Sequence, residues 1–367
     1  MTTFGIEEEY FLVDPRTLRP VSLAETVLQD LSPAVSRPGC ATHEFLASQL
    51  ERSTAVFTSL AEAQADLSRF RGELGAVARA HGVLAIGTGT PFTAPAAPTL
   101  TDAARYHEVA SGVRGVLRDH QICATHVHVG VPSREAGVQA LNRVRVWLPT
   151  LLALGGNSPF WRGRDTGFDS WRAVIMRRWA TTGCPPSFAD AADYDRRIRR
   201  LVGVAGTVDP ATVAWYGRLS EAYPTLEVRV ADAQLDLSPT LLLAALTRAL
   251  VVTALAEAER GTPPLEVEPE LLDAALWHAS RDGIRGELLD PAGRVMAPAR
   301  VVADNLVRYV DEALHSAGDG PRVAGLLEQL WQTGTGADRQ RQAFHSRGPS
   351  GLRALTESAF AVTDAAF

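Results

Sequence analysis

Apolar and polar residues alternate with a period of two near the start of the chain. Between residues 3 and 13, apolar side chains would face one side of an extended segment and glutamates the other. This spacing is that of a β-strand with one apolar face. The same alternation recurs over residues 122–131 and 225–231. We therefore predict three strands of one design, each with an apolar face that can pack on helices.

Helical spacing of apolar residues marks other parts of the chain. Over residues 56–81 it predicts an amphipathic helix that Gly82 can end. Two short strands are expected over residues 83–86 and 212–219, the first running into a glycine-rich loop. Further helices are expected over residues 101–119, 133–147, 171–179 and 238–260, followed by several shorter ones to the C-terminus.

Strands gathered in the first two-thirds, with helices between and after them, predict an α+β fold. We expect an antiparallel or mixed sheet backed by helices on one face. A break over residues 261–268 is rich in proline and could be a domain boundary or a helix–helix loop. Because the terminal helices could cover the sheet, we favour a single domain over residues 1–367, helical from about residue 239.

Composition narrows the class of protein. Hydrophobic residues make up 46% and charged residues 21% of the chain, and the net charge is −6. These values are typical of a globular protein and give no indication of nucleic-acid binding. The N-terminal glutamates do not fit a signal peptide, and no apolar stretch is expected to reach the length of a membrane span. We expect a cytoplasmic protein without a membrane partner.

The chain contains no lysine, which excludes two ways of binding ATP. P-loop proteins and protein kinases both place a lysine on the phosphates. If this protein binds ATP, metal ions and arginines must hold the phosphates.

Side chains that are costly to bury occupy the polar face of each predicted strand. If these faces line one concave surface, several carboxylates repel one another unless divalent cations lie between them. Carboxylates with an occasional imidazole suit Mg²⁺ or Mn²⁺. The segment over residues 43–51 adds two more glutamates, seven positions apart, either two helical turns apart or on opposite limbs of a hairpin. The candidates are Glu7, Glu9, Glu44, Glu51, His126, His128, Glu227 and Arg229.

Each motif also has a simpler interpretation. An isolated Glu-x-Glu is more often a solvated strand face, and a Glu-x-Arg is usually an ion pair. A His-x-His pair is as often exposed or hydrogen-bonded as bound to metal. Glu8 is expected at the surface or in an ion pair, and the loop over residues 87–89 is expected to be a simple turn. The recurrence of one pattern on three strands favours a shared site.

Taken in order, five motifs resemble the glutamate–cysteine ligase type 2 family of carboxylate–amine ligases. They are GIEEE at residues 5–9, HEF at 43–45 continuing to Glu51, THVHVGV at 125–131, NSPFW at 157–161 and TLEVRVAD at 225–232. The resemblance implies a glutamine synthetase-like sheet that forms a partial barrel, or funnel. It implies metal ligation by Glu7, Glu9, Glu44, Glu51, His126 and Glu227.

The resemblance also implies roles for several cationic residues. Arg229 is implied as the phosphate contact, acting with Glu227 in catalysis. His128 is implied as a nucleotide or substrate contact, and Arg172 and Arg177 are placed by position as carboxylate or phosphate contacts. The implied cofactors are ATP and Mg²⁺, with Mn²⁺ as a substitute.

The implied reaction joins a carboxylate to an amine through an acyl phosphate, releasing ADP. The usual pair in the family is glutamate and cysteine, which would give γ-glutamylcysteine. Three alternatives remain: another amine substrate, a metal-dependent amidohydrolase, and a binding protein that has lost turnover. The partners are then small molecules, and a homo-oligomer is left open.

Overall fold

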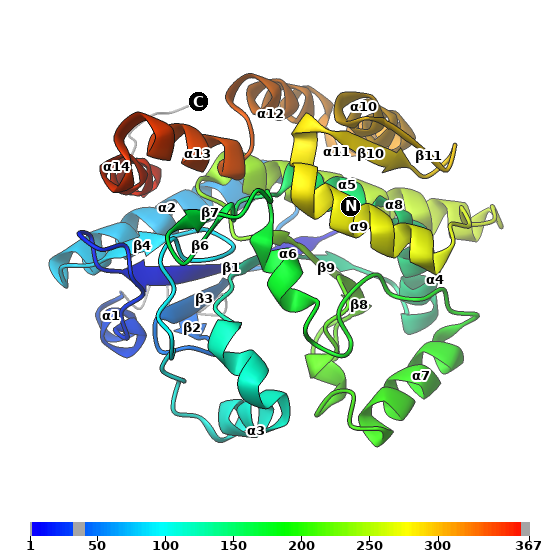
Figure 1. Cartoon of the computed structure of the whole chain (residues 1–367). Helices are drawn as coiled ribbons and strands as arrows, with labels where there is room; N and C mark the ends of the chain where they lie inside the picture. Colours follow the sequence, from blue (N-terminus) through cyan, green and yellow to red (C-terminus); the bar gives the residue numbers. More distant parts are fainter. Residues whose placement is uncertain (1, 32–40, 361–367) are drawn as a thin grey trace.

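A curved antiparallel sheet forms the centre of the computed structural model, which describes residues 2–31 and 41–360 (Figure 1). Its strand order is β2-β3-β1-β5-β9-β8, with β4 paired to the last three residues of β1, on the side opposite β3. Every pairing in this sheet is antiparallel. The strands are β1 (Phe4–Val13), β2 (Ala41–His43), β3 (Gln49–Ser53), β4 (Leu84–Ile86), β5 (Ala124–Gly130), β8 (Gly217–Leu219) and β9 (Thr225–Asp232).

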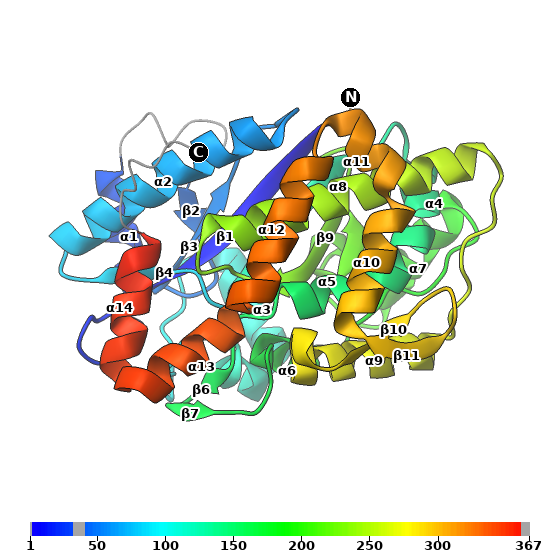
Figure 2. The same ribbon diagram turned by 90° about the horizontal axis from the view of Figure 1, so that it is seen from above.

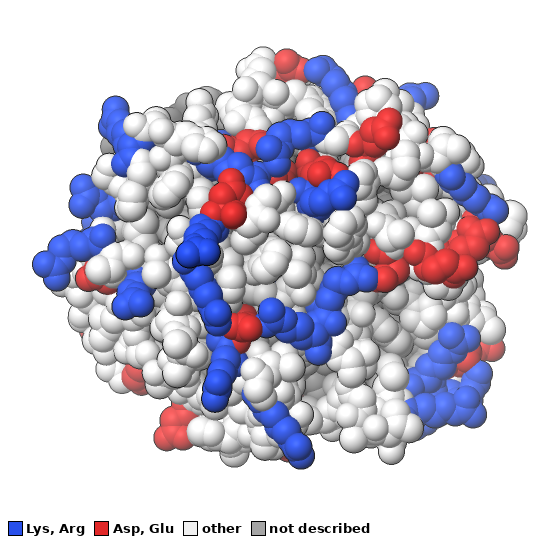
Figure 3. Space-filling view, in the orientation of Figure 1, with Lys and Arg blue, Asp and Glu red and all other residues white. Residues whose placement is uncertain are grey.

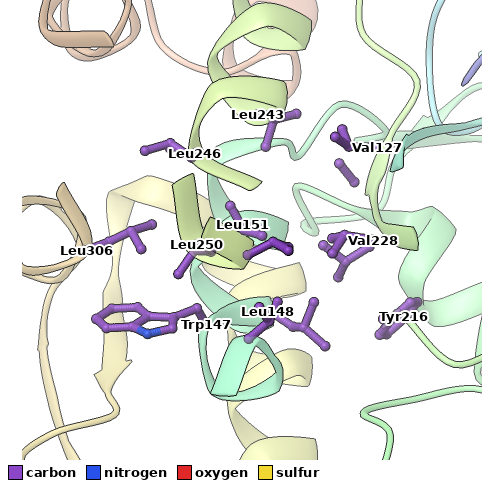
Figure 4. Close-up of a cluster of buried hydrophobic side chains, with 14 of the residues drawn as sticks. Val127, Trp147, Leu148, Leu151, Tyr216, Val228, Leu243, Leu246, Leu250 and Leu306 are labelled. Carbon is purple, nitrogen blue, oxygen red and sulfur yellow. The ribbon is translucent and has the colours of Figure 1, made fainter. Parts of the chain in front are cut away.

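Helices cover the apolar face of the sheet. The long α8 (Leu237–Glu259) packs against β5, α4 (Arg134–Val144) and α2 (Leu60–Ala80), and α5 (Leu148–Leu154) packs against β9. Figure 4 shows Leu243 of α8 and Leu151 of α5 on the side of Val127 and Val228 of the sheet, whereas Leu246 of α8 points to the side of Leu306. The alternation in the strands therefore buries its apolar side under helices, as the sequence indicates.

The C-terminal third adds a further helical layer, which lies above α8 and α5 in Figure 1 and is seen from above in Figure 2. A short hairpin interrupts these helices. The elements are α9 (Pro269–Asp282), β10 (Glu287–Asp290), β11 (Val295–Pro298), α10 (Ala299–Tyr309), α11 (Asp311–Ala317), α12 (Gly320–Thr333), α13 (Gly336–Arg347) and α14 (Pro349–Ala359).

Shorter elements border the opposite, polar face of the sheet. In Figure 1, α3, α6 and α7 lie around the edge of this face. The remaining short elements are α1 (Ala24–Asp30), α3 (Ala104–Val113), η1 (Arg114–Asp119), η2 (Arg145–Trp147), β6 (Phe160–Trp161), β7 (Arg164–Asp165), α6 (Trp171–Met176), α7 (Ala191–Gly203), η3 (Pro210–Thr212) and η4 (Gly283–Arg285). Of these, α1 contacts α2, and η2 and η4 contact α5, on the side covered by helices.

Charged side chains of both signs are interspersed over most of the face shown in Figure 3. A cluster of arginines at the lower right falls over α7, where Arg196 and Arg197 pair with Asp193.

The α+β class, the antiparallel sheet and the helical C-terminal third are confirmed. The strand expected over residues 212–219 is only β8, because Asp209 and Thr212 form a capping box that starts a 3₁₀ turn at Pro210. The hairpin β10–β11 was not expected, since its strands are four residues each and lie between helices.

The expectation that no apolar stretch reaches the length of a membrane span was wrong. Helix α8 has 23 residues and a mean hydropathy of 1.8, so it is long and apolar enough to cross a membrane. In this fold, however, 67% of its apolar window is buried against the sheet and neighbouring helices. Its composition is explained by its position between two layers of the protein.

Candidate active site

Strand register brings the predicted polar residues to one face of the sheet. Glu7 of β1 lies opposite His126 of β5, and Glu9 lies opposite Glu51 of β3. His128 of β5 in turn lies opposite Glu227 of β9. Side chains directly opposite each other in antiparallel strands share a face, so these pairs are neighbours in space.

A cavity of about 610 Å³ lies over this face. Nine of the ten side chains expected to bind metal, nucleotide or substrate line the cavity: Glu7, Glu9, Glu44, Glu51, His126, His128, Arg172, Glu227 and Arg229. Arg177 is the one expected residue that does not.

Two groups of three side chains could each hold a metal ion, and they share His126. In the first, His126 Nδ1 lies 2.9 Å from Glu7 Oε2 and 3.8 Å from Glu227 Oε1. In the second, His126 Nε2 lies 3.6 Å from Glu9 Oε1, and Glu51 completes the group. The two ring nitrogens therefore face different carboxylates.

Burial and mutual repulsion change the ionisation of two other carboxylates. Burial, followed by the charge of Glu9, raises the pKa of Glu44 to about 8. Burial and the charges of Glu7, Glu44 and Glu9 also raise the pKa of Glu51 well above its ordinary value. A site that protonates its own carboxylates near neutral pH is short of positive charge, which a divalent cation would supply.

The pKa values of two further carboxylates are lowered, because cationic side chains lie beside them. Burial opposes ionisation of Glu7, yet His126 and His128 hold its pKa well below its usual range. Burial likewise opposes ionisation of Glu227, but Arg218 and Arg229 lower its pKa to about 2. The cationic neighbours thus favour the ionised form of both carboxylates.

Unsatisfied nitrogen atoms in the cavity fit the binding of ions. Among the described residues, His126 Nε2, His128 Nε2 and Arg229 Nε are buried without a hydrogen-bond partner. His128 Nε2 lies 3.3 Å from Glu7 Oε1, at an angle that makes no hydrogen bond. Since buried polar atoms are normally paired, these nitrogens are available to a metal or a ligand. The donor set of carboxylates and imidazole fits Mg²⁺ or Mn²⁺.

Arg218 is a site residue that the sequence analysis missed. It lies opposite Glu227 on β8, and its Nε lies 2.7 Å from Glu227 Oε2. Arg229, two positions beyond Glu227, is 3.7 Å from Glu227 Oε1 through its Nε. Alternation of apolar and polar residues over Gly217, Arg218 and Leu219 could have indicated that Arg218 projects from a strand. Three residues are too few for such a pattern to be recognised.

Arg172 is at the cavity but is not free to bind a ligand with its whole guanidinium group. It is 1% exposed, and it donates to the backbone carbonyls of Val230 and Arg229, each at 3.1 Å. It therefore fixes the backbone of β9 beside the site. Arg177 lies away from the cavity and pairs with Asp273 of α9. The positional argument for Arg177 as a ligand contact has no geometric support.

The glycine-rich loop after β4 is more than a simple turn, because it packs closely against the end of β9. A Cβ at Gly87 would lie 2.1 Å from the carbonyl oxygen of Gln234. One at Gly89 would lie 2.5 Å from Asp232 Cγ. Only glycine permits this approach of two segments.

Aromatic side chains occupy one end of the cavity, beyond β5 residue Ala124. Phe45 and Tyr106 meet edge to face with ring centroids 5.5 Å apart, and His120 lies between Phe45 and Trp179. The sequence analysis did not identify these residues, because they come from loops and from α3 and have no shared spacing.

The model of the glutamate–cysteine ligase family 2 (GCS2) matches residues 3–358. The chain belongs to glutamate–cysteine ligase family 2. The resemblance seen in the five sequence motifs is thereby confirmed, and family 2 membership covers the helical C-terminal third, in which no motif could be quoted.

Family 2 relatives match along nearly their whole length. A protein of Frankia alni named "Putative glutamate--cysteine ligase 2-2" is 41% identical, over 94% of this chain and 93% of its own. A protein of the same name from Saccharopolyspora erythraea is 38% identical, over 98% and 92%. This chain is therefore a ligase of the glutamate–cysteine ligase kind.

Two solved structures share the fold at low sequence identity. The glutamate–cysteine ligase of Francisella tularensis in complex with AMP has a TM-score of 0.69 at 12% identity, covering 99% of this chain and 89% of that one. A bifunctional glutathione synthetase of Pasteurella multocida has a TM-score of 0.71 at 14% identity, covering 98% and 52%. At these low identities, the structural similarity shows only that this chain has the same fold as the two proteins.

Proposed function

We propose that this family 2 protein joins the γ-carboxylate of glutamate to the amino group of L-cysteine in the cytoplasm, using ATP and Mg²⁺. The products would be γ-glutamylcysteine, ADP and phosphate. The observation that carries the proposal is one cavity in which two metal-binding groups share His126 and adjoin Arg218 and Arg229. A carboxylate and ATP are both anions, so bringing them together requires positive charge. Carboxylates that bind metal ions and arginines that contact the phosphates would supply it.

In this proposal the two metal-binding groups have different neighbours. Glu7, His126 and Glu227 lie beside Arg229 and His128, which suits a metal that contacts the nucleotide phosphates. The group of Glu9, Glu51 and His126, with Glu44 nearby, lies toward the aromatic end. Bound Mg²⁺ would polarise phosphate oxygens and offset the repulsion between carboxylate and ATP.

The chain's own residues would perform the remaining tasks. Arg229 has an unpaired Nε and cannot be neutralised at physiological pH, so it can stabilise charge on the transferred phosphoryl group. Glu227 holds the guanidinium groups of Arg218 and Arg229 in place through its two oxygens. Arg172 fixes the β9 backbone from which Glu227 and Arg229 project.

Of the alternatives considered, another amine substrate remains open, since ligase chemistry would be the same. The amidohydrolase alternative lacks support, because the family that matches is a ligase family. Six glutamates and three histidines line the cavity, and among the described residues the two possible metal-binding groups contain only His126 as a histidine, where such a hydrolase would need several. A binding protein without turnover has little need for so many clustered carboxylates.

ADP release in magnesium buffer with glutamate and a panel of amines, with mass spectrometry of the products, tests the proposal. We expect γ-glutamylcysteine with glutamate and cysteine, and no product after EDTA treatment. ADP release with a different pair would keep the ligase chemistry and replace the substrates. Absence of nucleotide turnover with every pair would contradict the proposal.

A further inference from the structure

His120 occupies a defined place at the aromatic end of the cavity. It follows η1 and lines the cavity together with Phe45, Tyr106 and Trp179. Its ring centroid is 4.6 Å from that of Trp179 and 5.8 Å from that of Phe45, the latter at an interplanar angle of 80°. Rings on two sides leave the imidazole little freedom to rotate.

The hydrogen bond with Trp179 determines which ring nitrogen of His120 carries the proton. An indole N–H can only donate, and Trp179 Nε1 lies 2.9 Å from His120 Nδ1. Nδ1 must therefore accept, so the proton of the neutral imidazole resides on Nε2. A doubly protonated ring would place two N–H groups against each other.

The surroundings also keep this imidazole neutral. Burial, together with the positive charges of Arg172 and Arg229, lowers the pKa of His120 to about 3. Among the described residues, Trp179 is the hydrogen-bond partner of His120, and it uses Nδ1. The Nε2–H group is thus a neutral donor on the cavity wall that no described protein atom engages.

We propose that His120 is a specificity-determining residue, which donates from Nε2 to a carboxylate or carbonyl oxygen of the amine-bearing substrate. The assignment rests on the proposed ligase function and narrows its substrate class to α-amino acids and their derivatives. The aromatic walls would pack against the apolar part of such a substrate. A simple amine offers this N–H no acceptor, and a site that hydrogen-bonds one substrate discriminates strongly against an analogue that lacks the partner group.

The first test is made without turnover, on the full chain labelled with ¹⁵N-histidine. Long-range ¹H–¹⁵N spectra should show His120 as the Nε2–H tautomer, and Trp179→Phe should convert it to an exchanging mixture. With Mg²⁺, glutamate and β,γ-imido-ATP present, L-cysteine should shift the Nε2–H resonance and cysteamine should not. A charged ring, the Nδ1–H tautomer, or a response to the nucleotide in place of cysteine would overturn the assignment.

Kinetics with matched substrates give the second test. We expect wild type to prefer L-cysteine to cysteamine by at least about 100-fold in kcat/KM, and His120→Phe to reduce that preference to less than about 10-fold. The loss should appear in the KM for cysteine, with the KM values for glutamate and ATP within about two-fold of wild type. Equal use of both amines by wild type, or an unchanged preference in the variant, would refute the role of His120.

Failure of this inference can be distinguished from failure of the proposed function. If wild type releases no ADP with any substrate pair, the ligase proposal fails, and the tautomer and the cysteine-induced shift still decide the assignment of His120. If ADP is released but His120→Phe behaves as wild type, the ligase proposal stands and the specificity role is wrong.

Discussion

Three consecutive glutamates of β1 lie in two different environments. Glu7 and Glu9 face the cavity, whereas Glu8 faces the helices and is 1% exposed. Glu8 accepts hydrogen bonds from Arg71 Nε at 3.0 Å and from Thr240 Oγ1 at 2.7 Å. The sequence analysis allowed for an ion pair at Glu8, but its burial was not foreseen, because Arg71 is 63 positions away.

Glu51→Gln should abolish ligation while leaving the protein folded. Its carboxylate belongs to the second metal-binding group, and it is costly to ionise beside Glu7, Glu44 and Glu9. We expect kcat/KM to fall by at least about 100-fold, with a metal-free melting temperature equal to or above that of wild type. Steady-state ADP release and circular dichroism melts measure both, and unaltered turnover would remove Glu51 from the site.

Glu8→Gln, one position from Glu7, should reduce stability and leave turnover nearly unchanged. Removing one partner of a buried ion pair leaves the charge of Arg71 uncompensated and costs about 3–5 kcal/mol. We expect that loss in urea unfolding, with kcat per folded molecule close to wild type at low temperature. A stable variant with reduced turnover would mean that the two faces of β1 have been assigned the wrong way round.

Stability in the absence of metal should depend on pH. The pKa of Glu44 is raised from 4.5 to about 8, and that of Glu51 is also raised. A raised pKa in the folded state stabilises the protein below the unfolded value, and this contribution is lost as pH rises through the folded value. The metal-free protein should therefore lose stability progressively as the pH rises from about 4.5 to about 8.

Added Mg²⁺ should reverse that loss, because it binds the ionised carboxylates. We expect the rise in melting temperature caused by Mg²⁺ to be at least about 2 °C larger at pH 8.5 than at pH 6. Differential scanning fluorimetry with matched ionic strength measures it, and K⁺ serves as the control. An equal Mg²⁺ effect at both pH values would show that protons do not compete with the metal at Glu44 and Glu51.

Period-two alternation made most of the candidate site predictable at the scale of elements. It placed Glu7, His126 and Glu227 on a shared face before any pairing was known, and the antiparallel register then brought them together. The hairpin of β2 and β3 decides between the two geometries left open for Glu44 and Glu51, in favour of opposite limbs. Loop-borne groups such as His120 could not be predicted, because no periodicity fixes where a loop passes.

Gly87→Ala should destabilise the protein, because its Cβ would lie 2.1 Å from the backbone oxygen of Gln234. Backbone shifts of this kind typically cost about 1–3 kcal/mol. Gly325→Ala in α12 is the matched control, since its Cβ would meet nothing within 4 Å. It should stabilise by about 0.5–1 kcal/mol. Urea unfolding of both variants checks the contrast, and equal effects would refute the close approach at Gly87.

At the scale of the whole molecule, α8 connects the sheet to the C-terminal helices. It packs on β5 and α2 on one side and on α11 and α12 on the other. The apolar stretch that builds it is visible in the sequence, whereas the way in which the later helices stack on it is not. Their amphipathic patterns indicate only that each must bury one face.

A single cooperative unfolding transition is expected for the full chain, because the core around α8 is shared by the sheet and the C-terminal helices. Leu246→Ala, at a fully buried position of α8, should lower stability by about 2–5 kcal/mol and shift the whole transition. Differential scanning calorimetry makes the measurement. Two separate transitions, with only one of them shifted, would contradict the single domain predicted for residues 1–367.

The two-faced arrangement of β1 also limits how its gene can change length. Inserting or deleting one codon between Gly5 and Glu7 would rotate every later side chain of the strand to the other face, sending Glu8 into the cavity and Glu7 toward Arg71. A point substitution at one glutamate changes a single side chain, but such a shift exchanges the cavity-facing and the helix-facing sets at once. Length variation in this family should therefore be confined to the loops and the terminal helices, with β1 kept at constant spacing.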